Sequence, residues 1–286
     1  MKTAQELSRM IPPVARRFLA GETAPEAIQH AERLNEKNVS AILNLLGEHY
    51  TDRREAAADA QAYCDLATDI ARTDVDACLS VKPTQLGLDI SEDCFRRHLD
   101  AIVEEARAAD VFVWLDMEDY PTTDATLDAF EHHARNYGRV GVCVQANLRR
   151  TGDDLERLAA LPGKIRLVKG AYNPPPSVAY QSQERIDQVT REQLEYMFEH
   201  FEDGVALGSH DPELVTLAAD LHAKYGTPYE IQMLMGVRTQ AQYDLAAHHE
   251  VWQYVPYGAR WASYFYRRMT ERTGNVTFAL RALSPF

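Results

Sequence analysis

Residues 140–146 read Val140-Gly141-Val142-Cys143-Val144-Gln145-Ala146, a short and nearly continuous apolar run that is rich in β-branched side chains. This composition is typical of a strand that is buried on both faces of a parallel sheet. Comparable runs recur along the chain at residues 39–46, 77–82, 111–116, 165–169, 205–208, 229–234 and 251–255. The sequence therefore predicts eight buried strands.

Long amphipathic stretches separate these runs, with the apolar spacing of helices that pack by one face. The clearest of them cover residues 92–109, 123–137, 184–200 and 211–225. Eight strands that alternate with helices predict an α/β fold, a TIM-type (β/α)₈ barrel, over residues 39–286. An open doubly wound sheet is the alternative. No strand, however, is followed by Gly-x-Gly-x-x-Gly, the dinucleotide-binding pattern of that fold.

Residues 1–38 are expected to form a helical segment ahead of the barrel, with two helices. The first helix has apolar residues at helical spacing, and Pro12-Pro13 is expected to kink or split it. Thr23 and Glu26 have the spacing of a capping box, which predicts the start of the second helix.

The chain of 286 residues has a net charge of −13 and a pI near 5.2. Nucleic acid is therefore not expected as a partner, although a small basic pocket is compatible with this charge. The four cysteines form no Cys-x-x-Cys pair, so we expect no metal among the site residues. Few unpaired cysteines, a polar start and the lack of a membrane-length apolar run predict a cytoplasmic protein. Peripheral contact with the inner face of the membrane remains open.

Polar side chains stand at the ends of most predicted strands, where the active sites of such barrels lie. They are Glu48, Lys82, Asp116, Glu118, Gln145, Arg166, Lys169, Ser209, His210, Glu230, Gln232 and Tyr254. Each has a structural alternative. Lys82 and Asp116 could form an ion pair between strand ends, and His210 could cap the next helix. For Glu230 the structural role is favoured, in which it satisfies a lysine or backbone amides. Together the set favours a functional barrel mouth.

Residues 166–172 read Arg166-Leu167-Val168-Lys169-Gly170-Ala171-Tyr172, a strand end with two cations and a glycine. This pattern suits a phosphate or another electron-rich group, and it could equally hold a Schiff-base lysine at Lys169.

The stretch at residues 262–272, read as a helix, places four polar side chains on one face. They are Tyr264, Arg267, Arg268 and Glu271. Paired guanidiniums suit a small carboxylate ligand. The alternative is a solvated face on which Glu271 pairs with an arginine.

Over roughly residues 39–280 the chain resembles flavin-dependent proline dehydrogenase, either the single-function bacterial enzyme or the matching domain of the bifunctional proline-catabolic flavoenzyme. The motifs that carry the resemblance follow in order. They are Leu46-Gly47-Glu48, Ser80-Val81-Lys82, Leu115-Asp116-Met117-Glu118, Val144-Gln145-Ala146, residues 166–172, Ser209-His210-Asp211, residues 229–236, Tyr254-Val255-Pro256-Tyr257-Gly258, and Tyr264 with Arg267-Arg268-x-x-Glu271. The family fold is a distorted (β/α)₈ barrel whose last helix lies over the mouth.

The resemblance implies a role for each matching position. Asp116 and Arg166 match catalytic residues, and Arg166 would lie beside the flavin N5. Substrate-binding positions are matched by Lys82, Leu234, Tyr254, Tyr264, Arg267, Arg268 and Glu271. FAD-binding positions are matched by Met117, Gln145, Arg166, Lys169, Gly170, Ala171, Tyr172, Ser209, His210 and Gln232. Two positions depart from the family pattern: Asn147 replaces the more usual tyrosine, and Ser209 replaces the usual threonine.

The implied reaction is oxidation of L-proline to Δ1-pyrroline-5-carboxylate by hydride transfer to FAD, with electrons passed on to a quinone. Hydroxyproline or another cyclic amino acid remains open as a substrate. The alternative enzyme is a Schiff-base lyase of the aldolase type that uses Lys169 or Lys82. The alternative without catalysis is a barrel that binds small carboxylates through Arg267 and Arg268.

Overall fold

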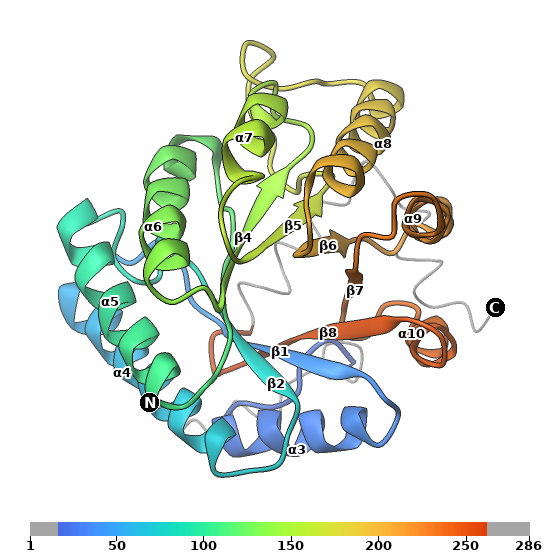
Figure 1. The fold of residues 1–286 in the computed structure, drawn as a ribbon. Helices are drawn as coiled ribbons and strands as arrows, with labels where there is room; N and C mark the ends of the chain where they lie inside the picture. The colour runs from blue at the N-terminus through green and yellow to red at the C-terminus, as the bar shows by residue number, and fades with distance from the viewer. Residues whose placement is uncertain (1–16, 262–286) are drawn as a thin grey trace.

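The computed structural model describes residues 17–261 of the chain. Eight parallel strands pair in chain order and form a closed barrel, because β8 pairs with β1. Seen along the barrel axis, a ring of helices surrounds the strands (Figure 1). The strands are β1 (Ser40–Leu45), β2 (Ala77–Val81), β3 (Val113–Leu115), β4 (Val140–Gln145), β5 (Lys164–Val168), β6 (Val205–Gly208), β7 (Tyr229–Leu234) and β8 (Glu250–Tyr257).

A helix follows each of the first seven strands. These helices are α4 (Arg53–Ala71), α5 (Glu92–Ala108), α6 (Thr123–Asn136), α7 (Thr151–Leu158), α8 (Gln183–His200), α9 (Pro212–Tyr225) and α10 (Thr239–Ala246), with a short 3₁₀ turn, η1 (Tyr120–Thr122), before α6. The helix α3 (Ala24–Asn35) precedes the barrel. None of the helices in this described part is both long and apolar enough to cross a membrane.

The predicted barrel and all eight predicted strands are confirmed. The largest differences are at β3, which begins at Val113 instead of residue 111, and at β8, which ends at Tyr257 instead of residue 255. The four predicted helices agree with α5, α6, α8 and α9 to within one residue at each end. The open doubly wound sheet is wrong, since the pairing of β1 with β8 leaves no sheet edge.

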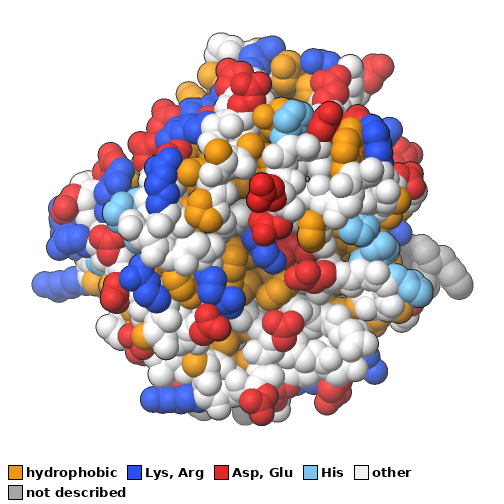
Figure 2. All heavy atoms as spheres, in the orientation of Figure 1, with side chains coloured by type: hydrophobic (Ala, Val, Ile, Leu, Met, Phe, Trp, Pro, Cys, Tyr) orange, Lys and Arg blue, Asp and Glu red, His pale blue; other side chains and the backbone are white. Residues whose placement is uncertain are grey.

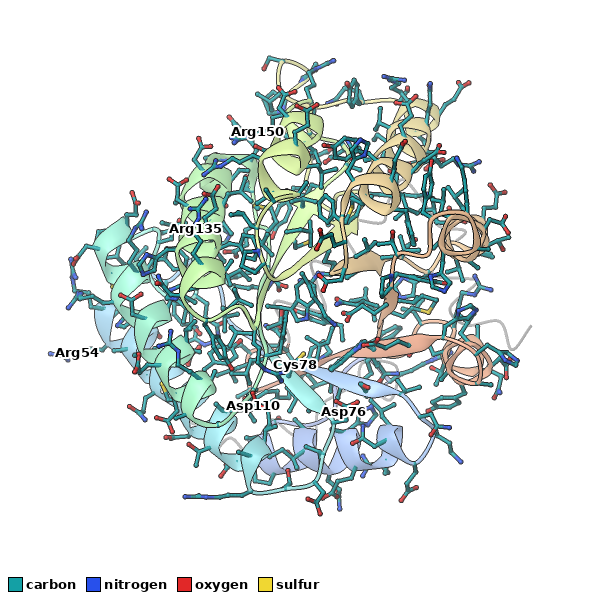
Figure 3. The ribbon with its side chains drawn as sticks, in the orientation of Figure 1. Arg54, Asp76, Cys78, Asp110, Arg135 and Arg150 are labelled. Atoms are coloured by element: carbon teal, nitrogen blue, oxygen red, sulfur yellow. The ribbon has the colours of Figure 1, made fainter. Side chains whose placement is uncertain are left out.

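Large side chains fill the barrel interior below the mouth. Ile42, Cys78, Trp114 and Ala206 form a buried cluster there, each from a different strand. Figure 3 shows Cys78 inside the ring of strands, whereas the labelled arginines lie on the outer helices. A Cβ atom on Gly141 would lie 2.5 Å from the indole of Trp114, so a glycine on β4 makes room for that ring.

Helix α3 closes the outer layer at the seam between β8 and β1. It begins after Thr23, whose backbone N–H donates to the Glu26 carboxylate at 3.0 Å, as the predicted capping box requires. Its apolar face, with Ala27, Ala31 and Leu34, joins the main core. The chain leading into it is tied to the end of β8, because the Ala20 N–H donates to the Pro256 carbonyl at 3.0 Å. An N-terminal helix therefore covers the seam.

On the face drawn in Figure 2, acidic and basic side chains are interspersed over the surface. Several of them form ion pairs between neighbouring helices, such as Arg157 with Asp128 at 2.7 Å. Exposed pairs of this kind contribute about 0–1 kcal/mol each, so the fold depends on the apolar core.

Candidate active site

A cavity of about 310 Å³ lies in the barrel mouth, at the carboxyl ends of strands β2 to β8. We call it the mouth cavity. It is lined by Glu48, Lys82, Asp116, Met117, Cys143, Arg166, Val168, Lys169, Gly170, Ala171, Tyr172, Gly208, Ser209, His210, Gln232, Met233, Leu234 and Tyr254. Every catalytic, substrate-binding and FAD-binding residue predicted within 17–261 is among them, with the exception of Gln145. Glu118 and Glu230, which were also predicted at strand ends of the mouth, are not.

Gln145 ends β4 as predicted, but its side chain turns to the neighbouring loop. Its side-chain amide donates to the backbone carbonyl of Glu118 at 2.9 Å, and the backbone carbonyl of Gln145 accepts from the Thr151 hydroxyl. Gln145 therefore fixes two loops behind the cavity, and the structure gives it no contact with the cavity itself.

Asp116 is the centre of the hydrogen-bond network on the floor of the mouth cavity. One carboxylate oxygen accepts from the Ser80 hydroxyl at 2.7 Å and from the Arg166 guanidinium at 2.5 Å. The other accepts from the Lys82 ammonium at 2.7 Å and from the Tyr254 hydroxyl at 2.6 Å. Four donors, from β2 and the residue that follows it, from β5 and from β8, thus converge on one carboxylate, which fixes its position.

The charges of this network hold one another in the ionised state. Burial by itself raises the pKa of Asp116, but the Lys82 ammonium and the Arg166 guanidinium outweigh it and place that pKa well below its usual range. Burial lowers the pKa of Lys82, yet Asp116 and Tyr254 overcome this effect and raise it well above its usual range. Burial also raises the pKa of the Tyr254 phenol, which stays protonated. At neutral pH the floor carries two cations and one anion.

Arg166 contacts Gln232 and Trp114 in addition to Asp116. A second guanidinium nitrogen donates to the Gln232 side chain at 2.8 Å, and the guanidinium carbon lies 4.9 Å from the centre of the Trp114 ring. A Cβ atom on Gly208 would lie 3.3 Å from the Arg166 side chain, so the glycine allows this close approach. The side chain of Arg166 is 6% exposed, so its direction is fixed by these contacts.

The network continues from the mouth toward the other end of the barrel. The Gln232 amide donates to Glu230 at 2.5 Å, and Glu230 pairs with Lys164. Glu230 is the second residue of β7, so its prediction as a strand-end group of the mouth is wrong. The alternative prediction, that it pairs with a lysine, is confirmed. It acts on Arg166 only through Gln232.

Glu118 is also buried but lies outside the lining of the cavity. Its carboxylate accepts from the backbone N–H and the hydroxyl of Thr84, both at 2.7 Å. It joins the loop after β3 to the loop after β2, which is a structural role.

One wall of the mouth cavity is the loop Lys169–Tyr172. Lys169 donates to Asp187 at 2.7 Å and to Asp211 at 2.8 Å. Gly170 has a φ of +112°, a conformation that favours glycine, and a Cβ there would lie 2.3 Å from Asn147 Oδ1. That oxygen is buried and has no hydrogen-bond partner in the described structure. Asn147, which replaces the tyrosine that is more usual in the family, therefore lies directly behind this loop.

The adjoining wall comes from the loop after β6, which Lys169 contacts through Asp211. His210 Nε2 accepts from the backbone N–H of Leu234 at 2.7 Å, which joins the ends of β6 and β7. The prediction that His210 might cap the next helix is wrong. Asp211 is the cap of α9, because its carboxylate accepts from the N–H of Glu213 at 3.0 Å.

Ser80 and Cys143 belong to the site without having been assigned a role from the sequence. Ser80 binds Asp116, and Cys143 lines the cavity below Arg166. Strand alternation was the available signal, because Ser80 precedes Lys82 by two residues and Cys143 precedes Gln145 by two.

The predicted carboxylate clamp lies outside the described residues. It comprises Tyr264, Arg267, Arg268 and Glu271, together with the predicted last helix over the mouth. Their predicted roles stay predictions.

Fold and site define a class: a (β/α)₈-barrel enzyme with a buried, cation-rich cavity at the carboxyl ends of its strands. A profile of the proline dehydrogenase family matches residues 27–281. Over 275 residues the chain is 34% identical to proline dehydrogenase 1 of Bacillus subtilis strain 168, covering 94% of this chain and 90% of that one. It is 31% identical over 281 residues to the proline dehydrogenase of Deinococcus radiodurans, with the same coverage. The chain belongs to the proline dehydrogenase family.

The fold agrees with that of a larger protein that has been solved. Proline utilization A (PutA) from Bdellovibrio bacteriovorus, in a form inactivated by N-propargylglycine, matches with a TM-score of 0.84 at 22% identity. The match covers 95% of this chain and 34% of that one, so this chain spans about a third of the PutA chain. PutA from Corynebacterium freiburgense matches with a TM-score of 0.75 at 23% identity.

Proposed function

We propose that this protein oxidises L-proline to Δ1-pyrroline-5-carboxylate, as an FAD-dependent enzyme of proline catabolism. The observation that carries the proposal is the floor of the mouth cavity, where Asp116 holds Lys82 and Arg166 as ordered cations. Family membership supplies the substrate class, and the floor supplies charges that match an amino acid carboxylate and an electron-rich ring.

Lys82 suits the substrate carboxylate because it donates one hydrogen bond to Asp116 and its ammonium has three donors. Tyr254 and Leu234 line the same cavity and offer surfaces for the pyrrolidine ring. The remaining proposed contacts to proline are those of Tyr264, Arg267, Arg268 and Glu271. Positioning by several fixed groups lowers the barrier by orienting the reacting carbon beforehand.

The residues present fit a flavin. Gly170 and Gly208 lack the Cβ atoms that would crowd the cavity wall. Behind that wall, Asn147 Oδ1 is a buried acceptor that has no partner among residues 17–261. When bound, FAD would supply the two-electron acceptor for the hydride that leaves the ring carbon next to nitrogen. The proposed FAD-binding residues are Met117, Gln145, Arg166, Lys169, Gly170, Ala171, Tyr172, Ser209, His210 and Gln232. Gln145 would act indirectly, through the loops that it fixes.

Asp116 and Arg166 are the proposed catalytic pair. Asp116 keeps Arg166 in one orientation, and the fixed guanidinium stabilises negative charge that develops over the cavity floor. We further propose that a quinone takes the electrons onward, in the cytoplasm or at the inner face of the membrane, as the family resemblance implies.

The geometry speaks against a Schiff-base lyase. A lysine that attacks a carbonyl must be neutral, which requires a lowered pKa. In Lys169, burial lowers the pKa, but hydrogen bonds to Asp187 and Asp211 outweigh it and raise the value above its usual range. Lys82 is held as an ammonium by Asp116.

A visible spectrum of the purified protein tests the proposal. We expect flavin absorption bands that bleach when L-proline is added without oxygen, and that persist with D-proline. Arg268→Met should raise the KM for L-proline at least ~10-fold while the flavin content stays unchanged. A colourless protein, or bands that L-proline leaves unchanged, would refute the proposal. The latter result would favour the carboxylate-binding barrel.

A further inference from the structure

We propose that Asp100, His132 and His133 form a binding site for a divalent transition-metal ion, such as Zn²⁺, on the outer surface between helices α5 and α6. Asp100 belongs to α5 and both histidines belong to α6. The two helices are neighbours in the outer ring (Figure 1). In the described part of the chain, this is the one place where three such side chains bring ligand atoms within 4.8 Å of one another.

Two of the three ligands lie close to the separation that a metal requires. Asp100 Oδ1 lies 3.2 Å from His133 Nε2. Zinc binds imidazole nitrogen and carboxylate oxygen at about 2.0–2.2 Å, so two ligands on one tetrahedral ion lie roughly 3.3–3.6 Å apart. The pair therefore needs a change of only a few tenths of an ångström to hold an ion between its atoms.

The third ligand is an exposed side chain that can turn to complete the site. His132 is exposed, and its Nε2 contacts Asn136 at 3.5 Å, at the limit of a hydrogen bond. The rings of His132 and His133 meet edge to face with centres 5.0 Å apart. A rotation of the exposed ring can bring its nitrogen to the ion, while water fills the remaining positions.

More of the charges around Asp100, His132 and His133 attract a cation than repel it. His133 lies in the last turn of α6, where the negative end of the helix dipole points. Arg107 opposes a cation there through its own positive charge. The carboxylate of Asp100 and the net charge of −13 act in the opposite direction.

The chemistry of the donor set selects the class of metal. Two imidazoles and one carboxylate suit Zn²⁺, Co²⁺ or Ni²⁺, whereas Ca²⁺ and Mg²⁺ prefer oxygen ligands throughout. The lack of a Cys-x-x-Cys pair does not bear on this site, because its ligands are one aspartate and two histidines from two helices. An ion here would join α5 to α6 without touching the mouth cavity.

Calorimetric titration of tag-free holoenzyme with ZnCl₂ tests the proposal, after treatment with EDTA and its removal. We expect one Zn²⁺ per chain, a raised Tm in the presence of Zn²⁺, and no response to Mg²⁺. His132→Ala and Asp100→Asn should each weaken the binding at least ~10-fold, while proline oxidation remains at the level of the unaltered protein. Both altered side chains are exposed, so these variants should fold normally.

The chain offers a matched control in its other neighbouring pair of histidines, His248 and His249. His249 contacts the Tyr229 hydroxyl at 3.1 Å, and no carboxylate completes a three-ligand group with this pair in the described residues. His248→Ala should leave the Zn²⁺ affinity unchanged. Binding that survives His132→Ala and Asp100→Asn, or the absence of a one-to-one event in the unaltered protein, would overturn the proposal.

Discussion

Asp116→Asn tests how much the fold depends on the charge at the floor of the mouth cavity. The substitution keeps the shape of the side chain but removes the anion that Lys82 and Arg166 share, at 2.7 and 2.5 Å. The side chains of Asp116 and Arg166 are 8% and 6% exposed, so water cannot replace the lost partner. Breaking a buried pair of this kind costs about 3–5 kcal/mol. For a domain of this size that corresponds to a fall in Tm of about 6–20 °C.

Thermal unfolding of the variant, followed by circular dichroism, measures this effect. Asp110→Asn is the matched control, because Asp110 pairs with Arg139 on the surface and its side chain is 82% exposed. It should shift the Tm much less. The dependence on pH gives a second readout. The lowered pKa of Asp116 stabilises the fold above the unfolded value, about 3.9, and this stabilisation is lost as pH falls below it. The variant should lack that acid-labile contribution.

The same variant should also lose activity, because the orientation of Arg166 depends on Asp116. We expect kcat/KM for L-proline to fall roughly 100-fold or more, measured on protein whose flavin content has been matched to that of the unaltered enzyme. A variant with the original Tm and with kcat/KM within about threefold of the original would refute the view that this carboxylate organises the site.

Three further predictions concern packing, the buried ion pair and helix capping. Gly141→Ala places a Cβ 2.5 Å from the Trp114 ring, so it should lower the free energy of unfolding, measured in urea, by about 1–3 kcal/mol. An unchanged free energy of unfolding would mean that the indole can move. Glu230→Gln removes the buried carboxylate that pairs with Lys164, and leaves the lysine with Glu250 at 3.8 Å. Because the lysine side chain is 33% exposed, we expect the free energy of unfolding to fall by only about 1–3 kcal/mol. The fall in kcat should be smaller than the fall that Asp116→Asn produces, and an equal fall would contradict an indirect role of Glu230. Ser91→Ala removes the side-chain cap of α5 and should lower the free energy of unfolding by about 0.5–2 kcal/mol with kcat unchanged, and a change in kcat would contradict a purely local effect.

The barrel could be predicted because its signal is local. Each strand is buried on both faces, so runs such as residues 140–146 and 205–208 are apolar in themselves and need no partner to be recognised. The interior arrangement could not be read in the same way. The contact between Gly141 and Trp114 depends on the register of β3 against β4, which no single strand encodes.

The residues of the site likewise fall into those that the sequence could predict and those that it could not. Lys82, Asp116 and Arg166 could be placed at strand ends from the sequence, and their roles followed from resemblance to a family. Glu230 was grouped with the residues of the mouth although it is the second residue of the run 229–234, and the amino end of a parallel strand faces away from the mouth. Ser80 is a small polar residue within a strand, and only the folded barrel shows that it donates to Asp116.

The seam between β8 and β1 has a consequence for the order of events during synthesis. Helix α3 leaves the ribosome early, but its apolar face packs partly against β8, the last strand of the barrel. The partner of β1 on that side is also β8, which runs to Tyr257. Until that strand emerges, α3 and one edge of β1 are left exposed to solvent or to chaperones, so these contacts form only after β8 has been synthesised.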